Sequence, residues 1–385
     1  KEVTSRIDFP KMEEDVLKKW SEEQTFEASL ENRSNAKEYL FYDGPPFATG
    51  LPHYGHLLAG TIKDIIPRYQ TMRGKRVERR FGWDCHGLPI EALAQDALAL
   101  AGAPAIKEAG VGVFNEKCRS MVSTYVSEWE KTVTRMGRWV DFKNDYKTMD
   151  LTFMESIWWV FAQLWQQNRV YRAHRIMPYS WKLNTPLSNF EAGRNYKDVQ
   201  DPAITIQLKL NNFEIEAFAL IWTTTPWTLP ANLAICVGSD IEYAVVKDLK
   251  NQCVYILAES RIGAYYRDSS EYEYLKKVKG SDLLGLEYEP IFYDYKDHPN
   301  SFKILNDDFV STEDGTGIVH MAPAYGEDDY RICRNAQIEL VDPLNEDCVF
   351  TNEIKMLAGL FCKDADKIII KYLKENKKLI HQSTI

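Results

Sequence analysis

The sequence predicts an α/β protein of two domains, because two kinds of pattern occupy separate parts of its 385 residues. In the first part, an apolar run, a turn rich in glycine and proline, a helical stripe and a second apolar run follow one another within residues 37–81, which is the order of a parallel βαβ unit. After residue 195, short β-rich segments separated by turns replace the helical patterns. We therefore expect an α/β domain at residues 1–195 and a β-rich domain at residues 196–385.

The elements of the first domain follow from residue spacing. Apolar residues recur at helical intervals in Lys11–Thr25, and Lys37–Asp43 is a short apolar and aromatic run that predicts a buried strand. A loop at Gly44–Pro52 leads into a second helix, which we expect Pro67 to bend or end. A second strand is expected at Val77–Phe81.

Residues 88–168 are predicted to be mostly helical. An apolar stripe at helical spacing in this region is expected to pack into the core rather than to form a cofactor site. Its members are Phe153, Ile157, Trp158, Phe161, Leu164 and Trp165. The strands expected in the second domain are Ala203–Leu210, Glu214–Thr224, Ala231–Val237, Tyr243–Val246 and Val254–Ala258, and a helix is expected at Asp364–Asn376.

Composition excludes several classes of protein. No apolar stretch approaches the roughly 18 residues that span a bilayer, and Lys1–Asp8 has no signal-peptide core, so we expect a cytoplasmic protein without a membrane partner. The seven cysteines lie far apart without a Cys-x-x-Cys pair, which indicates a reducing compartment and no zinc site, and we predict no bound metal. The net charge of −9 argues against a surface that grips nucleic acid throughout, although the basic run Arg73–Arg80 is compatible with an edge that faces phosphate.

Two histidines, His53 and His56, begin the helix after the first loop and lie three residues apart on one face. Free backbone N–H groups at a helix start attract anions, and imidazoles there can hydrogen-bond phosphate or neutralise charge that develops on it. Histidines at a helix start are more often capping or packing residues. The preceding strand and Gly-Pro-Pro turn, and the absence of a Walker-type phosphate loop, favour a site for nucleotidyl transfer.

The segment His53-Tyr54-Gly55-His56 resembles the His-Ile-Gly-His signature of class I aminoacyl-tRNA synthetases, with tyrosine in the second position. The resemblance implies the first half of a Rossmann-like nucleotide-binding fold. It also implies that His53 and His56 contact the phosphates of ATP during adenylate formation, while Gly55 lies beneath the adenine or ribose. ATP would enter with Mg²⁺ as its counter-ion.

The decapeptide Gly82–Glu91 (GWDCHGLPIE) resembles the isoleucine enzymes of this family. The aspartate of Gly-Trp-Asp receives the substrate ammonium in those enzymes, which implies that role for Asp84. Pro45 and nearby backbone are then expected to shape the pocket for the aliphatic side chain. Without the resemblance, an aspartate at a strand-to-helix turn is more often a capping residue.

A cluster of hydroxyl groups follows an apolar strand in Ile221–Val237 (IWTTTPWTLPANLAICV). Threonines are common on ordinary sheet surfaces, but this group lies beside Asn232 and can orient a water molecule or receive ester oxygens, with Trp227 as an aromatic wall. The segment Gly315–Tyr330 (GTGIVHMAPAYGEDDY) adds His320 and two adjacent aspartates.

Both segments resemble motifs of the editing domain (CP1) inserted into isoleucine, valine and leucine synthetases, and the isoleucine form is the most similar. The resemblance implies that Asp329 binds the ammonium of a misattached amino acid. The other residues implied to line the site or to hold substrate or water are Thr224, Thr225, Thr228, Asn232 and His320. Asp328 is the alternative if the register differs by one residue. Strand alternation at this point would send the two carboxylates in opposite directions, so only one should face the pocket.

An editing site would answer a problem of selectivity. A missing methylene group weakens binding in a hydrophobic pocket by only about 1–3 kcal/mol, and isoleucine synthetases are themselves the standard example of this limit. Valine therefore enters an isoleucine pocket too often. The expected partners are tRNA(Ile), isoleucine and ATP, with valine as the editing substrate once it is attached to tRNA.

The resemblance covers essentially the whole chain, but the second class I signature, Lys-Met-Ser-Lys-Ser, and an anticodon-binding region are missing from it. We therefore expect a piece of a longer synthetase that does not aminoacylate alone. One alternative is a stand-alone tRNA-editing hydrolase or tRNA-binding module with a vestigial nucleotide fold. The other is a valyl-tRNA synthetase, against which the intact Gly-Trp-Asp-Cys-His-Gly and Thr-Pro-Trp sequences count.

Overall fold

The computed structural model describes residues 6–47, 49–194 and 196–385, and the chain divides into two compact units, Lys1–Arg172 and Ala173–Ile385. This division falls before the boundary expected at residue 195, and Asn195 itself lies outside the described residues. The segment between the two positions is tied to the second unit. The Tyr179 hydroxyl donates to the Glu346 carbonyl at 2.8 Å, and Trp181 packs edge-on against Phe361.

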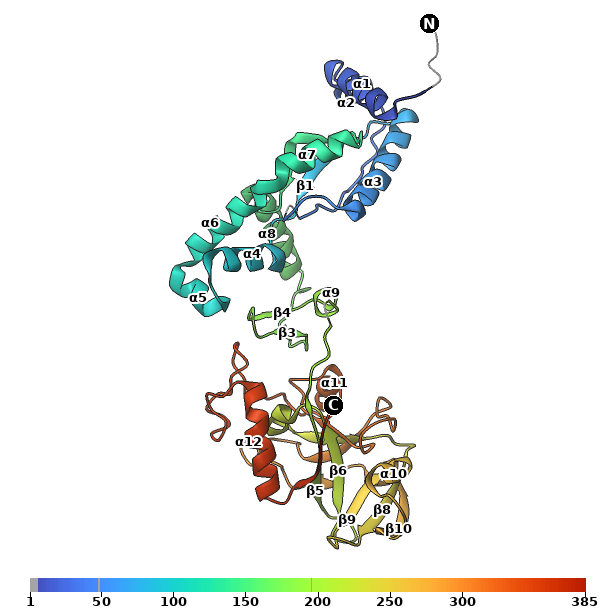
Figure 1. Ribbon diagram of the computed structural model, residues 1–385, viewed down its shortest axis with the longest axis vertical. Coiled ribbons are helices and arrows are strands. Elements are labelled where there is room, and N and C mark those ends of the chain that lie inside the picture. The colour runs from blue at the N-terminus through green and yellow to red at the C-terminus, as the bar shows by residue number, and fades with distance from the viewer. Residues whose placement is uncertain (1–5, 48, 195) are drawn as a thin grey trace. The chain divides into compact units, whose positions relative to one another are not determined.

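The first unit is mainly helical (Figure 1). Its helices are α1 (Phe9–Glu22), α2 (Thr25–Glu31), α3 (Tyr54–Met72), α4 (Leu88–Leu98), α5 (Gly102–Ala109), α6 (Val111–Val122), the 3₁₀ turn η1 (Ser123–Tyr125), α7 (Val126–Arg135) and α8 (Leu151–Gln166), and its strands are β1 (Arg80–Trp83) and β2 (Asp141–Lys147). The mostly helical character expected for residues 88–168 is confirmed, and β2 interrupts it.

Strand β1 pairs in parallel with β2, and the chain before α3 makes two single parallel bridges with residues that flank β1. The bridges join Glu38 to Arg76 and Phe47 to Asp84. The prediction of a continuous strand at residues 37–43 is therefore wrong, because the pairing takes the form of single bridges.

Between the two bridges, the backbone carbonyl of Asp43 accepts a hydrogen bond from the Tyr146 hydroxyl at 3.3 Å. The second expected strand, at residues 77–81, appears as β1, which begins and ends slightly later.

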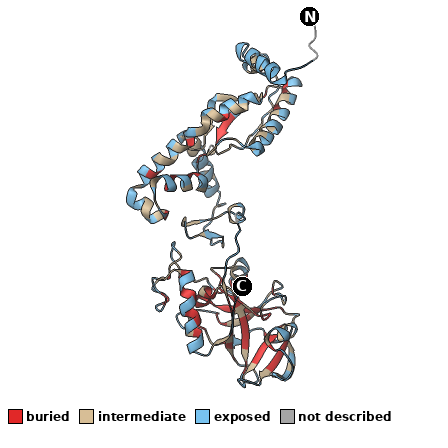
Figure 2. Ribbon diagram, in the orientation of Figure 1, coloured by how far each residue is buried: buried red, intermediate tan, exposed pale blue. Residues whose placement is uncertain are grey.

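We expected Pro67 to bend or end helix α3, and of these two effects the ending does not occur, because the helix continues to Met72. Its apolar stripe is exposed, and none of the residues of α8 is buried (Figure 2). Trp158 and Trp165 of α8 are 60% and 61% exposed, so the prediction that the α8 stripe packs into a core is wrong for this structure. Helical periodicity identified an apolar face, but burial also requires a second element to cover that face.

The second unit is built around a sheet. Its strands are β3 (Tyr179–Ser180), β4 (Thr185–Pro186), β5 (Pro202–Asn211), β6 (Phe218–Thr223), β7 (Ala234–Val237), β8 (Glu242–Asp248), β9 (Val254–Ala258), β10 (Tyr272–Lys279), β11 (Glu287–Tyr288), β12 (Lys303–Asn306), β13 (Val319–Met321) and β14 (Leu379–Thr384). Its helices are α9 (Asn189–Ala192), η2 (Pro226–Ala231), η3 (Glu259–Arg261), α10 (Ile262–Tyr265), η4 (Gly280–Leu283), α11 (Glu327–Asn335) and α12 (Cys362–Glu375). The five strands and the helix expected from the sequence are confirmed as β5 to β9 and α12.

The large sheet has the order β10-β8-β9-β6-β13-β7-β12-β11-β5-β14, and β5 also pairs with β6. This second pairing closes β5, β6, β13, β7, β12 and β11 into a ring. The apolar side chains of these strands fill a continuous core, which α12 joins through Ala365 and Ile369 (Figure 2). The second unit thus buries a core of its own.

Among the described residues, no helix combines the length and apolar character needed to cross a membrane.

Candidate functional site

The start of α3 is organised by its two histidines. His53 is the N-cap, and its Nδ1 accepts the N–H of Gly55 at 3.1 Å. The backbone N–H of His53 donates in turn to Nδ1 of His56 at 3.2 Å, and the two rings stack with centroids 3.7 Å apart. Because each Nδ1 is an acceptor, each neutral ring carries its proton on Nε2. The arrangement places two N–H donors at a helix N-terminus, where anions are favoured.

His56 is held in its neutral form. Burial, and then the charges of His53 and Lys63, lower the pKa of His56 below its ordinary value. It therefore offers a hydrogen bond rather than a charge. Trp129 packs 4.7 Å from the His56 ring and donates through Nε1 to the Gly50 carbonyl at 2.8 Å, which ties the preceding loop to α7.

Two further residues shape this helix start. A β-carbon on Gly55 would meet Cε1 and Nδ1 of His53 at 3.0 and 3.1 Å, so the glycine makes room for the His53 ring. Lys63, two turns into α3, pairs with Asp43 and donates to the Gly44 carbonyl at 3.0 Å. A cation and two N–H donors are thus presented along one helix.

Asp84 lies one residue past the end of β1, as expected, and its N–H donates to the Pro46 carbonyl at 2.9 Å. Pro45 is the neighbouring loop residue and is half-buried. The structure therefore brings Asp84 and the Gly-Pro-Pro turn together at one parallel bridge.

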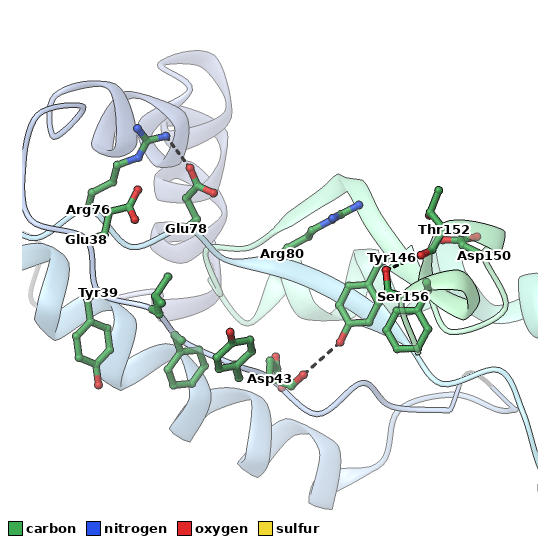
Figure 3. A pocket seen from close by; sticks show the side chains of 14 residues that line it. Glu38, Tyr39, Asp43, Arg76, Glu78, Arg80, Tyr146, Asp150, Thr152 and Ser156 are labelled. Atoms are coloured by element: carbon green, nitrogen blue, oxygen red, sulfur yellow. Dashed lines mark hydrogen bonds and ion pairs between the residues drawn. The ribbon is translucent and has the colours of Figure 1, made fainter. Parts of the chain in front are cut away.

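A cavity of ≈ 640 Å³ lies along residues 38–43 and the start of α8 (Figure 3). Arg76 and Glu78 form an ion pair of 2.6 Å at its rim, and the Tyr146 hydroxyl points toward Asp43. The lining contains none of the residues predicted to be catalytic or substrate-binding.

A cavity of ≈ 490 Å³ in the second unit gathers most of the other predicted site residues. Five of them line it: Thr224, Thr225, Thr228, His320 and Asp329. They come from the turn after β6, from β13 and from the start of α11. Side chains about 100 positions apart in the sequence therefore meet at one cavity, whose remaining walls include Trp222, Phe309 and Tyr325.

The threonines form a connected group of hydroxyls. Thr225 donates its backbone N–H to Oγ1 of Thr223 at 3.1 Å, and its own Oγ1 lies 3.3 Å from that of Thr223 and 3.4 Å from that of Thr228. The Thr228 hydroxyl donates to the Thr225 carbonyl at 2.8 Å. These short-range bonds fix the turn that carries the hydroxyls.

His320 is buried behind the threonines, and burial lowers its pKa to about 4. Its Nε2 lies 2.8 Å from Oγ1 of Thr228, and its Nδ1 lies 3.1 Å from Nδ2 of Asn232. Asn232 is therefore not a wall of the cavity but a partner of His320.

Asp329 and Asp328 lie in the first turn of α11 and not in a strand, so the alternation argument for separating them is wrong. Their side chains nevertheless diverge. Asp329 lines the cavity and accepts the Ala322 N–H at 2.7 Å, whereas Asp328 pairs with Arg331 at 2.8 Å on the exposed side. Burial raises the pKa of Asp329, although the Ala322 N–H opposes that rise. An anionic Asp329 in this setting would favour a cation beside it.

Residues 15–356 match the family model described as tRNA synthetases class I (I, L, M and V). The chain belongs to this family. It is 52% identical over 378 residues to an isoleucine–tRNA ligase of Protochlamydia amoebophila, covering 98% of this chain and 36% of that protein. It is 48% identical to the cytoplasmic isoleucine–tRNA ligases of Arabidopsis thaliana, covering 97% of this chain and 34% of that protein, and of Saccharomyces cerevisiae, covering 100% and 37%.

A solved structure described as "The crystal structure of GlLeuRS-CP1" aligns with 47% of this chain and 99% of its own, with a TM-score of 0.38 and 15% identity. The chain spans about a third of the length of the curated relatives that it matches.

In this class I synthetase chain, the expected role of Trp227 as an aromatic wall is wrong. Its ring packs edge-on against Tyr325 at 5.0 Å and joins the core, and Tyr325 lines the cavity instead. The backbone N–H of Trp227 donates to the Asp366 carboxylate at 2.8 Å.

Sequence reasoning missed several residues at the cavity. Trp222 and Tyr325 lie inside the two motifs that were singled out, so their aromatic character was an available signal. Asp366 and Tyr288, which act from α12 and β11, stand in no motif that could have marked them.

Proposed function

We propose that the whole protein is an isoleucine–tRNA ligase, which activates isoleucine with ATP, transfers it to tRNA(Ile) and hydrolyses valine misattached to that tRNA. This chain would supply the first half of the activation site and the complete editing pocket. The observation that carries the proposal is the cavity at which Thr224, Thr225, Thr228, His320 and Asp329 meet.

The cavity suits an aminoacyl ester. Asp329 would offer a carboxylate to the ammonium of the amino acid, and the hydroxyls of Thr224 and Thr225, which line the same cavity, would hydrogen-bond ester or water oxygens. Trp222 and Phe309 give apolar surface for a small aliphatic side chain. Valine on tRNA fits this combination of charge, hydroxyls and apolar wall.

The start of α3 suits the phosphates of ATP, which would arrive with Mg²⁺ as part of the substrate. The Nε2–H groups of His53 and His56 would donate to phosphate oxygens, and Lys63 would add positive charge. Asp84 would receive the ammonium of isoleucine, with Pro45 beside its side chain. The two histidines, Lys63 and Asp84 would stabilise charge without forming a covalent bond to the substrate.

Exposed apolar surface in the first unit supports a nucleotide-binding fold that continues beyond this chain. Leu40, Tyr42 and Leu58 are largely exposed, as are the tryptophans of α8. Large apolar side chains that are exposed in such numbers are characteristic of an interface. We assign the cavity of Figure 3 to this interface rather than to a ligand. The names of the relatives from Arabidopsis and yeast support a cytoplasmic location.

A deacylation assay tests the proposal. The 385-residue chain should release valine from preformed Val-tRNA(Ile) and leave Ile-tRNA(Ile) largely intact. Equal cleavage of both, or of neither, would refute the editing assignment.

The second candidate is a hydrolase that acts without an activation site, which the self-contained core of the second unit favours. Isoleucine-dependent pyrophosphate exchange by the whole protein separates the two functions, because only a ligase performs it.

A further inference from the structure

A chain of buried hydrogen bonds runs behind the cavity, from Tyr288 through Asn232 and His320 to Thr228. The Tyr288 hydroxyl donates to Oδ1 of Asn232 at 2.7 Å. All four residues are buried, and Tyr288 and Asn232 lie behind the residues that line the cavity. A fully satisfied buried network holds its members in one arrangement.

The network determines which way the Asn232 amide points. Its Nδ2 faces the carbonyls of Ala234 at 2.9 Å and Met321 at 3.4 Å, both of which can only accept. Its Oδ1 faces the hydroxyl of Tyr288, which donates. The amide nitrogen must therefore also be the donor to Nδ1 of His320.

The amide in turn determines the tautomer of His320. Because Nδ1 accepts from Asn232, the ring proton is on Nε2, and Nε2 donates to Oγ1 of Thr228. The Thr228 hydroxyl then has its own proton free for the Thr225 carbonyl, which lies 2.8 Å away. Each proton in this series of hydrogen bonds, from Tyr288 to Thr228, then has one position.

We propose that Tyr288 is a positioning residue of the editing pocket, which acts through Asn232 to hold His320 as a neutral Nε2–H donor to Thr228. This role rests on the proposed function. Both ring nitrogens of His320 are occupied by protein groups, so His320 orients the Thr228 hydroxyl and does not take a proton from a water molecule in the cavity. The low pKa of His320 agrees with a ring that stays neutral.

Removal of the Tyr288 hydroxyl should loosen this arrangement. In Tyr288→Phe, Oδ1 of Asn232 loses its donor while the Ala234 and Met321 carbonyls still hold Nδ2, so the amide is held less firmly and its bond to Nδ1 of His320 weakens. A His320 ring without a firm donor at Nδ1 can carry its proton there, and in that form the Thr228 hydroxyl turns toward Nε2, away from the Thr225 carbonyl. The hydroxyl face of the cavity changes although no residue that lines it has been replaced.

Nitrogen NMR of the histidine rings in the 385-residue chain measures the tautomer of His320 directly. The chain has seven histidines, and the signals that disappear in His320→Gln are those of His320. We expect the Nε2–H form in the native chain at neutral pH and a mixture with the Nδ1–H form in Tyr288→Phe. Asn232→Asp, whose carboxylate can only accept, should give the Nδ1–H or doubly protonated form. An Nδ1–H ring in the native chain would overturn the proposal without any variant.

Deacylation of Val-tRNA(Ile) provides the functional arm. Tyr288→Phe should lower kcat about tenfold and leave KM unchanged, the scale of one buried hydrogen bond. Tyr255→Phe is the matched control, because it also removes a buried hydroxyl, bonded to Asn251 at 2.7 Å, but in a separate cluster. A Tyr288→Phe chain with native kcat, or with a native tautomer, would refute the positioning role. Absence of valine release by the native chain would instead refute the proposed function, while the ring spectrum still decides the tautomer.

Discussion

The carboxylate of Asp329 occupies the space that a side chain on Gly326 would fill. A β-carbon built on Gly326 overlaps Oδ2 and Cγ of Asp329. Gly326 is the N-cap of α11 and Asp329 lies in the first turn of that helix, so the glycine lets the carboxylate fold back toward the helix start and accept the Ala322 N–H. The position of the Asp329 carboxylate at the cavity thus depends on the lack of a side chain at Gly326.

Gly326→Ala should therefore displace the Asp329 carboxylate and slow Val-tRNA(Ile) deacylation at least about tenfold, the scale of a lost charge-assisted hydrogen bond. The backbone of Gly326, with φ of −141°, is accessible to alanine, so the helix should still form. Gly263→Ala is the control, since a β-carbon there meets nothing within 4 Å. Native deacylation by Gly326→Ala would show that the carboxylate position does not matter.

Asp329→Ala should reduce Val-tRNA(Ile) hydrolysis by roughly ten- to a hundredfold or more and leave isoleucine activation untouched. Asp328→Ala should have little effect, because its exposed ion pair with Arg331 is of a kind worth only about 0.2–1 kcal/mol. The readout is release of valine from preformed Val-tRNA by the full-length enzyme. If only Asp328→Ala loses valine release, the ammonium-binding role belongs to Asp328. If both variants release valine at the native rate, the editing assignment is refuted.

His56→Ala should slow isoleucine-dependent pyrophosphate exchange by about a hundredfold or more in the full-length enzyme, because it removes one donor to the developing phosphate charge. Deacylation of Val-tRNA should survive, since His56 belongs to the first compact unit and the editing cavity to the second. Native exchange rates in this variant would contradict the nucleotidyl-transfer role.

The 385-residue chain alone should show negligible pyrophosphate exchange with ATP, Mg²⁺ and isoleucine. Its sequence contains no Lys-Met-Ser-Lys-Ser segment, and large apolar faces of α3 and α8 are uncovered. Robust exchange by the purified chain would refute the half-site interpretation.

Asp366→Asn should stabilise the chain at neutral pH. Burial raises the pKa of folded Asp366 to about 6, above an ordinary 3.8, so the folded state holds this proton more tightly than the unfolded state. Its contribution to the free energy of unfolding therefore falls as pH rises from about 4 to 6, by on the order of 2–3 kcal/mol. Asparagine keeps an oxygen to accept the Trp227 N–H without the buried charge.

Urea unfolding of the native and Asp366→Asn chains across pH 4 to 8 measures this difference. The variant should be more stable above pH 6, and the two should converge near pH 4. Lys363 and Asp201 also act on this carboxyl and pair with each other at 2.6 Å, so both chains must retain them. A stability gap that widens as pH falls would contradict the assignment of this proton to Asp366.

Local sequence patterns were enough to predict several elements and motifs. A β-rich composition located β5 to β9, helical spacing located α3 and α12, and a Gly-Pro-Pro turn followed by paired histidines marked the start of α3. These features depend on neighbouring residues, whose spacing decides which side chains share a face.

The way in which distant segments combine could be seen only in the folded protein. It showed that the two aspartates lie on a helix, where Asp329 faces the cavity because Gly326 leaves it room. In the folded protein, Trp227 packs toward the core. Tyr288 bonds to Asn232, which lies 56 positions earlier in the sequence, and Asp366 bonds to Trp227, which lies 139 positions earlier. The fold also leaves the stripe of α8 exposed, because periodicity marks an apolar face but only a packed partner can bury it.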